Sequence, residues 1–341
     1  MKLRLPARSW LATSVFAAYA TLFPLTQAFA EDPAAAQAPA SAAATNAAPA
    51  PAPAAAATGA RARGVLWEVR SGEKTAYLFG SIHLAKAEYY PLPDTVENAF
   101  KQADTLAVEI DASDSSAVKK MMPLLTYKQG DNLQKHLKPA TWKKLQKLTG
   151  TAADRMQAIK PAVVASALVV SAFAQKGFDP KQGVDLHFIE RARKDSKAIV
   201  ELESPEFQAK ILGGLSDADG DAMLAETLDG MLNGNLFAET NKMISAWKDG
   251  DAAGLGKILN ELNNKDAGSR HVTKLLLDDR NPGMADKIAA MIKDGKHLMV
   301  VVGALHMTGK HSLVELLQKK GFEVRLIDAP ADKPADTPPA Q

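Results

Sequence analysis

The chain of 341 residues contains no cysteine. Disulfides, cysteine-based zinc sites, thiol catalysis and lipid anchoring through cysteine are therefore all excluded. Any metal ion must be bound by histidine and carboxylate side chains, and the chain has only seven histidines. Two hydrolase motifs are missing as well, since the sequence holds neither His-Glu-x-x-His nor Gly-x-Ser-x-Gly. The standard zinc-protease helix and the nucleophile elbow of α/β-hydrolases are thus not supported.

A strong excess of charge of either sign is also lacking. Lysine and arginine number 41, aspartate and glutamate 39, and the formal net charge is +2. Residues 1–30 carry three positive charges and no negative one, so the remainder of the chain has a net charge of −1. This balance gives no electrostatic reason to expect nucleic acid or an anionic membrane surface as a partner.

The N-terminal apolar stretch is too short for a membrane span. It runs from Trp10 to Leu25 behind three basic residues, and Thr21 and Pro24 interrupt it. Its uninterrupted part is shorter than the roughly 20 apolar residues that cross a bilayer. Ala28-Phe29-Ala30 then supplies the small-x-small pattern of a signal-peptidase site. We expect residues 1–30 to be a cleaved signal peptide, and the mature protein to be periplasmic or secreted without a membrane anchor.

Two low-complexity segments flank the region that can form a core. Residues 31–63 are mostly alanine and proline, and residues 329–341 contain four prolines. Neither segment offers much apolar surface to bury, so we expect a disordered linker and a disordered tail. Residues 64–328 are long enough for one large domain and show no repeat of fixed period.

Strand patterns lie near both ends of this domain, and helical patterns lie between them. Short β-branched and aromatic runs predict strands at 65–70, 75–82, 105–110, 198–202, 297–302 and 323–327. Helical patterns cover most of 115–175, 183–194 and 221–278. Asp94, with Glu97 three residues later, predicts a capped helix start. The sequence therefore predicts one α/β (α+β) domain, in which N- and C-terminal strands form a single mixed sheet around a large helical insertion.

The most informative motif is a pair of Gly-x-x-His tetrapeptides. Gly80-Ser81-Ile82-His83 and Gly303-Ala304-Leu305-His306 each close an apolar run that is typical of a buried strand. A residue just past such a strand lies at the sheet edge where α/β proteins build their sites. We therefore expect His83 and His306 to converge on one site, with Glu109 gathered at the same edge. Imidazoles more than roughly 10 Å apart would contradict a shared site, because metal–nitrogen bonds are only about 2 Å long.

Four other polar residues occupy positions with a possible role in this site. Glu109 ends the apolar run 105–108, where a charged residue at a solvated strand end is the alternative interpretation, and Glu203 lies at the end of another predicted strand, just before a helix cap. Asp185 shares a helical face with apolar residues, so it is expected to anchor another group. Arg280 precedes a helix start, and a surface ion pair with one of the two aspartates before it is the alternative. The other five histidines have no supporting context.

Eight short motifs extend over residues 64–328. In chain order they are Leu66-Trp67-Glu68-Val69, Leu78-Phe79-Gly80-Ser81-Ile82-His83-Leu84, Tyr90-Pro91-Leu92-Pro93, Val108-Glu109, Gly183-Val184-Asp185-Leu186-His187-Phe188, Leu202-Glu203, Asp279-Arg280-Asn281 and Val302-Gly303-Ala304-Leu305-His306. Together they resemble the TraB/GumN family, which includes the Tiki proteases. The resemblance implies a fold related to the erythromycin-esterase and haem-binding ChaN-like proteins. It also implies metal-dependent proteolysis, as in the Tiki members, or action on peptide pheromones, as in the plasmid-encoded TraB members.

The resemblance places the family's histidine pair on His83 and His306, its acidic residue on Glu109 and its arginine on Arg280. Two imidazoles and a carboxylate make a three-ligand site with open positions for a divalent ion. Zinc, manganese, iron and cobalt all suit such ligands, and the resemblance favours manganese or cobalt over zinc. Glu203 is then a candidate general base, and Arg280 a candidate stabiliser of the oxyanion.

These features predict an exported, metal-dependent, peptidase-like hydrolase that acts on a peptide or protein. Two alternatives stay open. In the first, no metal is required and a histidine acts directly as general base. In the second, the protein is a non-catalytic periplasmic protein that binds a peptide or haem in the same cleft.

Overall fold

The computed structural model describes residues 62–327. The expected signal peptide, nearly all of the expected linker and the expected tail lie outside the described residues. Within residues 62–327, no helix is long and apolar enough to span a membrane.

Six strands form one mixed sheet in the order β4-β3-β5-β2-β1-β6. Their bounds are Val65–Ser71 for β1, Lys74–Ser81 for β2, Thr105–Val108 for β3, Ala198–Glu201 for β4, Leu298–Gly303 for β5 and Glu323–Ile327 for β6. Strands β4, β3, β5 and β2 are parallel, while β1 is antiparallel to both of its neighbours. The fold class expected from the sequence, with N- and C-terminal strands in one mixed sheet, is confirmed.

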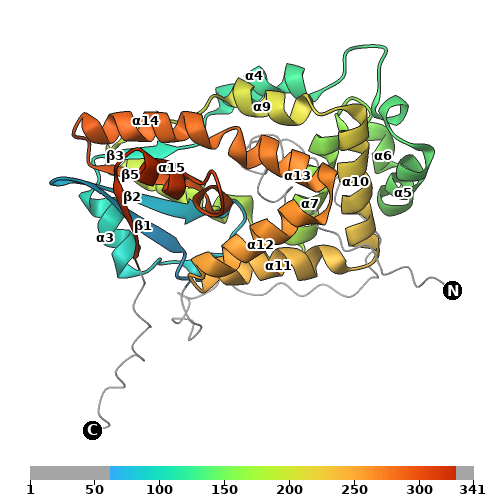
Figure 1. Cartoon of the computed structure of the whole chain (residues 1–341). Helices are drawn as coiled ribbons and strands as arrows, with labels where there is room; N and C mark the ends of the chain where they lie inside the picture. The colour runs from blue at the N-terminus through green and yellow to red at the C-terminus, as the bar shows by residue number, and fades with distance from the viewer. Residues whose placement is uncertain (1–61, 328–341) are drawn as a thin grey trace, which may run out of the picture.

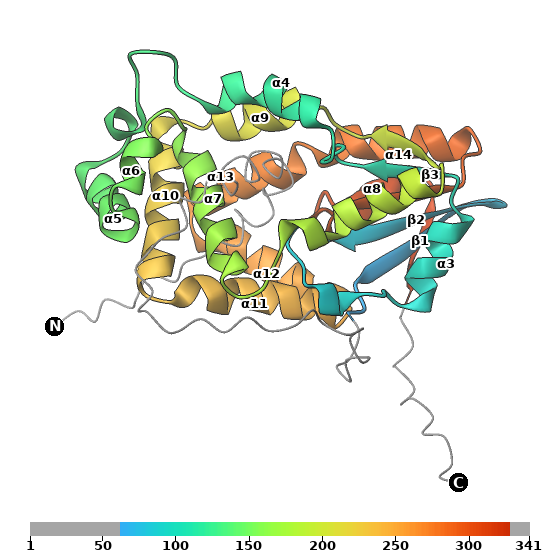
Figure 2. The ribbon, with the colours of Figure 1, turned by 180° about the vertical axis from the view of Figure 1, so that it is seen from behind.

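Helices cover both faces of the sheet. Helices α14 (Asn281–Lys293) and α15 (Leu313–Lys319) lie on one face, and α3 (Asp94–Gln102) and α8 (Val184–Lys194) lie on the other (Figures 1 and 2). Every residue of β5 is buried as a result, which explains why this central strand is a continuous apolar run rather than an alternating one. Phe188 of α8 packs edge-on against Phe79 of β2, with 5.8 Å between ring centroids.

The other helices extend from the side to which the parallel strands point (Figures 1 and 2). They are α4 (Ser115–Leu125), α5 (Pro139–Thr149), α6 (Ala152–Arg155), α7 (Pro161–Ala174), α9 (Pro205–Gly213), α10 (Asp217–Leu232), α11 (Asn235–Lys248), α12 (Ala252–Lys265) and α13 (Ala267–Thr273). Short 3₁₀ turns lie at Ala87–Tyr89, Leu133–His136, Pro180–Gln182 and Ala304–Met307, and a π-helix at Lys274–Asp278. Trp247 of α11 is fully buried and donates its indole N–H to the Gly80 carbonyl at 2.6 Å. That hydrogen bond ties the helical insertion to the first Gly-x-x-His motif.

Local sequence signals account for several element ends. Pro161 is the first residue of α7, and the Ser204 hydroxyl accepts the Phe207 N–H at the start of α9. The expected cap at Asp94 is wrong, because α3 already begins at Asp94 and follows Pro93 with no side-chain capping bond. Strand β3 ends at Val108, two residues before the expected end, which leaves Glu109 as the first residue beyond the strand.

Candidate functional site

The four parallel strands end at one edge of the sheet, and a chemically important side chain follows each of them. Glu203 follows β4, Glu109 follows β3, His306 follows β5 and His83 follows β2. The pairing of Ser81 with Gly303 sets the two Gly-x-x-His motifs side by side. Ligand sites of open α/β sheets form at this carboxyl edge. The four side chains therefore lie along the sheet edge in the order of their strands.

Both histidines are buried and held through the same ring atom. The Nδ1 atom of His83 lies 2.6 Å from Oδ2 of Asp185, and the Nδ1 atom of His306 lies 2.6 Å from Oδ1 of Asn281. Oxygen acceptors at Nδ1 place the proton there, so Nε2 presents its lone pair when the ring is neutral. Metal-bound histidines are typically oriented in this way. The Nε2 atom of His306 is buried and has no hydrogen-bond partner.

The three expected metal ligands converge on Gly303. A Cβ atom at Gly303 would lie 3.4 Å from Oε1 of Glu109, 3.5 Å from Nε2 of His83 and 3.5 Å from Cδ2 of His306. Oε1 of Glu109 is also 3.7 Å from Nε2 of His306. The structure thus brings His83, Glu109 and His306 close to one another beside Gly303.

A buried arginine connects the two glutamates. Arg280 donates through Nε to Glu203 at 2.9 Å, through Nη2 to Glu109 and to Glu203, and through Nη1 to the Leu276 carbonyl at 2.9 Å. Gln208 donates its amide to Glu203 at 2.8 Å and to Glu109 at 3.2 Å. The side chains of Arg280, Glu109 and Glu203 are at most 4% exposed. This network holds both carboxylates against one buried cation.

The alternative interpretation of Arg280, a surface ion pair with a neighbouring aspartate, is wrong. Asp279 pairs with Lys274 instead, and both of those side chains are exposed. In the present conformation each nitrogen of Arg280 already donates a hydrogen bond. The guanidinium therefore acts on the site through its charge and through the carboxylates that it holds.

Burial and the neighbouring charges fix the protonation of the site. Burial alone would raise the pKa of Glu109, but Arg280, the two histidines and the Gly303 N–H outweigh it and lower this pKa to about 2. Burial lowers the pKa of His306 to about 3, although Glu109 opposes the shift. Burial also acts to lower the pKa of His83, but Asp185 and Glu109 outweigh it and raise this pKa. Glu109 is thus a carboxylate and His306 a neutral imidazole at neutral pH.

Asp185 connects the first motif to helix α8. Its Oδ1 accepts the hydroxyl of Ser81 at 2.6 Å, while its Oδ2 faces Nδ1 of His83. Gly183, just before α8, packs against the backbone of His83, since a Cβ there would lie 2.5 Å from the His83 carbonyl oxygen. The structure therefore places Asp185 against His83, where the sequence pattern had indicated only an anchor of unknown target.

Sequence reasoning missed three residues of this site. Ser81 and Asn281 each hydrogen-bond to one candidate residue, and Gln208 hydrogen-bonds to two. Ser81 and Asn281 lie inside the quoted motifs, which was the only available signal for them. Gln208 lies on α9 with no such signal.

Two small hollows border His83, and each has room for little more than one water molecule. The first is lined by Glu109, Ile110, Ala112, Gly183, Asp185 and Leu186, and we name it the acidic hollow. The second is lined by Ile82, Met243, Leu277, Ala304, Leu305 and His306, and we name it the apolar hollow. His83 lines both hollows.

The donor set fits a divalent metal ion, although the donors are not assembled around one position. Two imidazole nitrogens and a carboxylate suit a first-row metal. The buried Nε2 atom of His306 has no hydrogen-bond partner and is available as a ligand. Within residues 62–327, however, no three His, Asp or Glu side chains are arranged to hold an ion. The Glu109 carboxylate accepts the Gly303 N–H at 2.8 Å and bonds to Arg280, which turns it toward those partners.

Comparisons with known proteins identify the family and the relatives of this chain. The family model described as the TraB/PrgY/gumN family matches residues 65–326. The uncharacterized protein YbaP of Shigella flexneri and that of Escherichia coli (strain K12) are each 28% identical over 256 residues, which is 72% of this chain and 89% of theirs. Metalloprotease TIKI2 of Danio rerio is 22% identical over 315 residues, and the match covers 76% of this chain but only 60% of that protein. No solved structure gives a significant match.

Proposed function

This chain belongs to the TraB/PrgY/gumN family, and we propose that it is a metal-dependent hydrolase of peptides or proteins. In this proposal His83, Glu109 and His306 are the ligands of a divalent ion. The observation that carries the proposal is the buried Nε2 of His306, which has no partner and faces Glu109 Oε1 at 3.7 Å. Buried polar atoms without a partner are rare and costly in folded proteins, and a metal ion would satisfy this one. The likeness to metalloprotease TIKI2 supports the same chemistry.

The identity of the ion is proposed from the ligands and the family together. Two nitrogens and one oxygen suit manganese, cobalt or zinc, and the resemblance to the family favours the first two. A divalent ion bound here supplies Lewis acidity, which makes water a nucleophile at neutral pH.

The chain's own residues orient the donors and move the proton. Asp185 and Asn281 hold the two Nδ1 atoms, so both Nε2 atoms are directed away from them and toward the site. Glu203 is proposed as the general base that takes the proton of the attacking water. Arg280 forms ion pairs with both Glu203 and Glu109. Its buried charge also lowers the energy of the negative charge that develops on the substrate carbonyl oxygen.

Three variants test the assignment of roles. His306→Ala is expected to remove both bound metal and activity, because it deletes one of three ligands. Glu203→Gln is expected to keep the metal while slowing turnover by roughly 10²–10⁴-fold, the span for a lost general base. His271→Ala is the matched control, because its side chain is 53% exposed and lies on α13, and it should change neither property.

The measurements are metal content after dialysis and the rate of peptide cleavage, for each variant and the wild type. Loss of metal in Glu203→Gln would contradict its role as base. Cleavage that survives both chelation and His306→Ala would favour the metal-free alternative, in which His83 held by Asp185 acts as the base.

We also propose that the protein acts in the periplasm or after secretion, without a membrane anchor. The support for this proposal is the pattern of residues 1–30.

A further inference from the structure

Gln208 is buried between the two glutamates of the site. It is 0% exposed and lies on α9, which begins two residues after Glu203. Its Nε2 atom donates to Oε2 of Glu203 at 2.8 Å and to Oε2 of Glu109 at 3.2 Å. One amide group therefore bridges the proposed general base and a proposed metal ligand.

The backbone alone already sets these two glutamates next to each other. The N–H of Leu202 donates to the Val108 carbonyl at 2.8 Å. The N–H of Glu203 donates to the Glu109 carbonyl at 2.9 Å, so the pairing of β4 with β3 continues past the ends of both strands. Neighbouring buried carboxylates repel each other unless donors lie between them. Arg280 and Gln208 are those donors.

The two donors occupy the oxygens of Glu203 unequally. Oε2 of Glu203 accepts Nη2 of Arg280 at 2.6 Å, Nε of Arg280 at 3.2 Å and Nε2 of Gln208 at 2.8 Å. Among the described residues, Oε1 of Glu203 accepts one hydrogen bond, from Nε of Arg280 at 2.9 Å. Each carboxylate oxygen has two lone pairs. Oε2 is therefore saturated, whereas Oε1 keeps a lone pair that can accept a proton.

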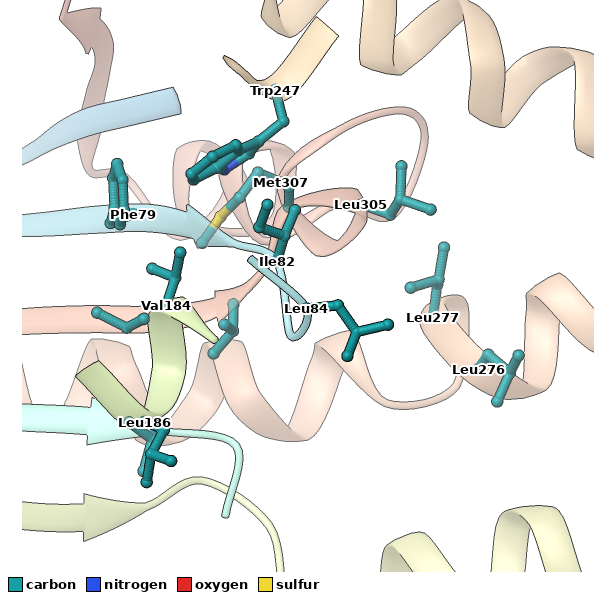
Figure 3. Close-up of a cluster of buried hydrophobic side chains, with 14 of the residues drawn as sticks. Phe79, Ile82, Leu84, Val184, Leu186, Trp247, Leu276, Leu277, Leu305 and Met307 are labelled. Atoms are coloured by element: carbon teal, nitrogen blue, oxygen red, sulfur yellow. The ribbon is translucent and has the colours of Figure 1, made fainter. Parts of the chain in front are cut away.

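Separate parts of the fold hold the two donors in place. Nη1 of Arg280 donates to the carbonyl of Leu276 in the π-helix, and Figure 3 shows Leu276 within a cluster of buried hydrophobic side chains. Gln208 is held by α9, which packs so closely against α4 that a Cβ atom at Gly213 would clash with the Leu124 carbonyl oxygen. Both donors therefore come from tightly packed segments.

The carbonyl oxygen of Gln208 explains why packing alone does not account for a glutamine here. Oε1 of Gln208 is buried and has no hydrogen-bond partner among the described residues. An amide turned the other way would set this oxygen against both carboxylates, so its neighbours fix its orientation. A buried acceptor without a partner destabilises a fold, and methionine would fill a similar volume without one. The glutamine is thus explained by its N–H donor.

We infer that Gln208 is a positioning residue of the proposed hydrolase. Together with Arg280 it occupies Oε2 of Glu203, so that Oε1 takes the proton of the attacking water. In this step an O–H bond of the water breaks, the proton moves to Oε1, and the electron pair left on the water oxygen forms the bond to the substrate carbonyl carbon. The inference rests on the proposed function and deepens it, because it assigns the proton to one atom of the base. Gln208 lies in none of the eight motifs of the sequence analysis.

A double-mutant cycle between Gln208 and Glu203 tests this inference. Gln208→Met keeps an unbranched side chain of similar size and removes the amide. In peptide cleavage by protein supplied with metal, it is expected to lower kcat at least about 10-fold, but less than the roughly 10²–10⁴-fold expected of Glu203→Gln. KM should stay nearly unchanged, because Gln208 is buried and does not contact the substrate. In the Glu203→Gln background Gln208→Met should lower kcat no further, because residues that act through one another are not additive.

A metal titration supplies a measurement that does not depend on activity. Gln208→Met should lower divalent-metal affinity by less than the roughly 10–100-fold typical of a lost partner of a metal ligand. The reason is that Gly303 and Arg280 still hold Glu109. Thr227→Val is the matched control, since Thr227 is also 0% exposed and its hydroxyl donates to a carbonyl within α10, away from the sheet (Figure 1). It should change neither kcat nor metal affinity.

Thermal unfolding shows whether each variant folds. If Gln208→Met does not fold, Gln208→Asn takes its place in the cycle, because asparagine keeps the amide but is one methylene too short to reach both glutamates. The same loss of kcat and the same lack of additivity are expected of it.

Failure of the inference and failure of the proposed function are distinguishable. The inference alone is overturned by a wild-type kcat in the Gln208 variant, or by a double variant slower than Glu203→Gln by the full effect of the Gln208 substitution. A roughly 10–100-fold loss of metal affinity would overturn it as well, because Gln208 would then orient the metal ligand rather than the base. If the wild type cleaves no peptide with any metal, the proposed function fails and the inference fails with it.

Discussion

Replacing Arg280 by methionine is expected to destabilise the fold strongly and in a pH-dependent manner. Arg280→Met keeps an unbranched side chain but removes the positive charge that both Glu109 and Glu203 contact. The two glutamates would then be buried like charges with Gln208 as their shared amide donor. Burial and mutual repulsion both raise the pKa of a carboxyl group.

Two independent arguments give the size of the stability loss expected for Arg280→Met. Removing one partner of a buried ion pair typically costs about 3–5 kcal/mol, because the other charge stays buried. For Glu109 alone, a pKa lowered from 4.5 to about 2 corresponds to stabilisation on the order of 3 kcal/mol at neutral pH, at about 1.4 kcal/mol per pH unit. We therefore expect Arg280→Met to lower the free energy of unfolding by about 3–5 kcal/mol at pH 7.

The sign of the pH dependence also follows. The pKa of Glu109 is depressed in the wild type, so its stabilisation is present above pH 4.5 and is lost as the pH falls toward 2. In Arg280→Met the pKa of this carboxyl is raised, so protonation relieves the buried charge already in mildly acidic solution. The difference in the free energy of unfolding between the wild type and Arg280→Met should therefore shrink as the pH is lowered from 7 to 5.

Urea denaturation of the wild type, Arg280→Met and Arg193→Met at pH 5, 6 and 7 measures this. Arg193 is the matched control, since its side chain is 49% exposed and pairs with Asp111 at the surface. Arg193→Met should lower the free energy of unfolding by no more than about 1 kcal/mol, and this effect should depend little on pH. Equal destabilisation by the two substitutions, or a deficit that does not change with pH, would refute the reasoning.

Three further predictions concern other residues. Asp185→Asn weakens the acceptor of His83 and is expected to lower divalent-metal affinity about 10–100-fold in a metal titration; unchanged affinity would contradict the orienting role of Asp185. Burial lowers the pKa of His187, which stacks on Tyr90 with 4.1 Å between centroids, to about 4. The wild type should therefore lose stability as the pH falls from about 6.5 to 4, because only the unfolded state binds the proton there. His187→Phe should reduce this slope in denaturation curves, and an identical slope would contradict the shift. N-terminal sequencing of the exported protein should begin at Glu31, and recovery of the initiating methionine from membranes would contradict cleavage.

The convergence of the two histidines could be predicted because the signal is local and repeated. Each Gly-x-x-His closes a buried apolar run, and parallel strands bring their carboxyl ends to the same edge. Since β2 and β5 are neighbours, the motif ends at His83 and His306 meet. The same argument anticipated Glu109, which follows β3 on the other side of β5.

The partners of Arg280 could not be predicted, because they are remote in the sequence. Glu109 and Glu203 lie 171 and 77 positions away, while two aspartates are immediate neighbours. Only the sheet order β4-β3-β5, which depends on non-local pairing, brings both glutamates beside α14. Gln208 is a neutral residue on a helix, and nothing in its local pattern marks a residue that bonds two carboxylates.

The expected cap at Asp94 failed for a local reason. An acidic residue in the first turn of a helix is favourable to the helix dipole whether or not it is the capping residue. Asp94 and Glu97 both lie in that first turn, so the same pattern fits a helix that begins one residue later than α3 does.

The most direct test of the central claim is peptide cleavage by the purified wild type after chelation, and again after the addition of Mn²⁺, Co²⁺ or Zn²⁺ singly. If His83, Glu109 and His306 hold a catalytic ion, chelation abolishes cleavage. One of the metals then restores it as a single ion binds per chain, and His306→Ala neither binds the ion nor recovers. Cleavage that persists without metal, or restored cleavage in His306→Ala, would contradict the claim.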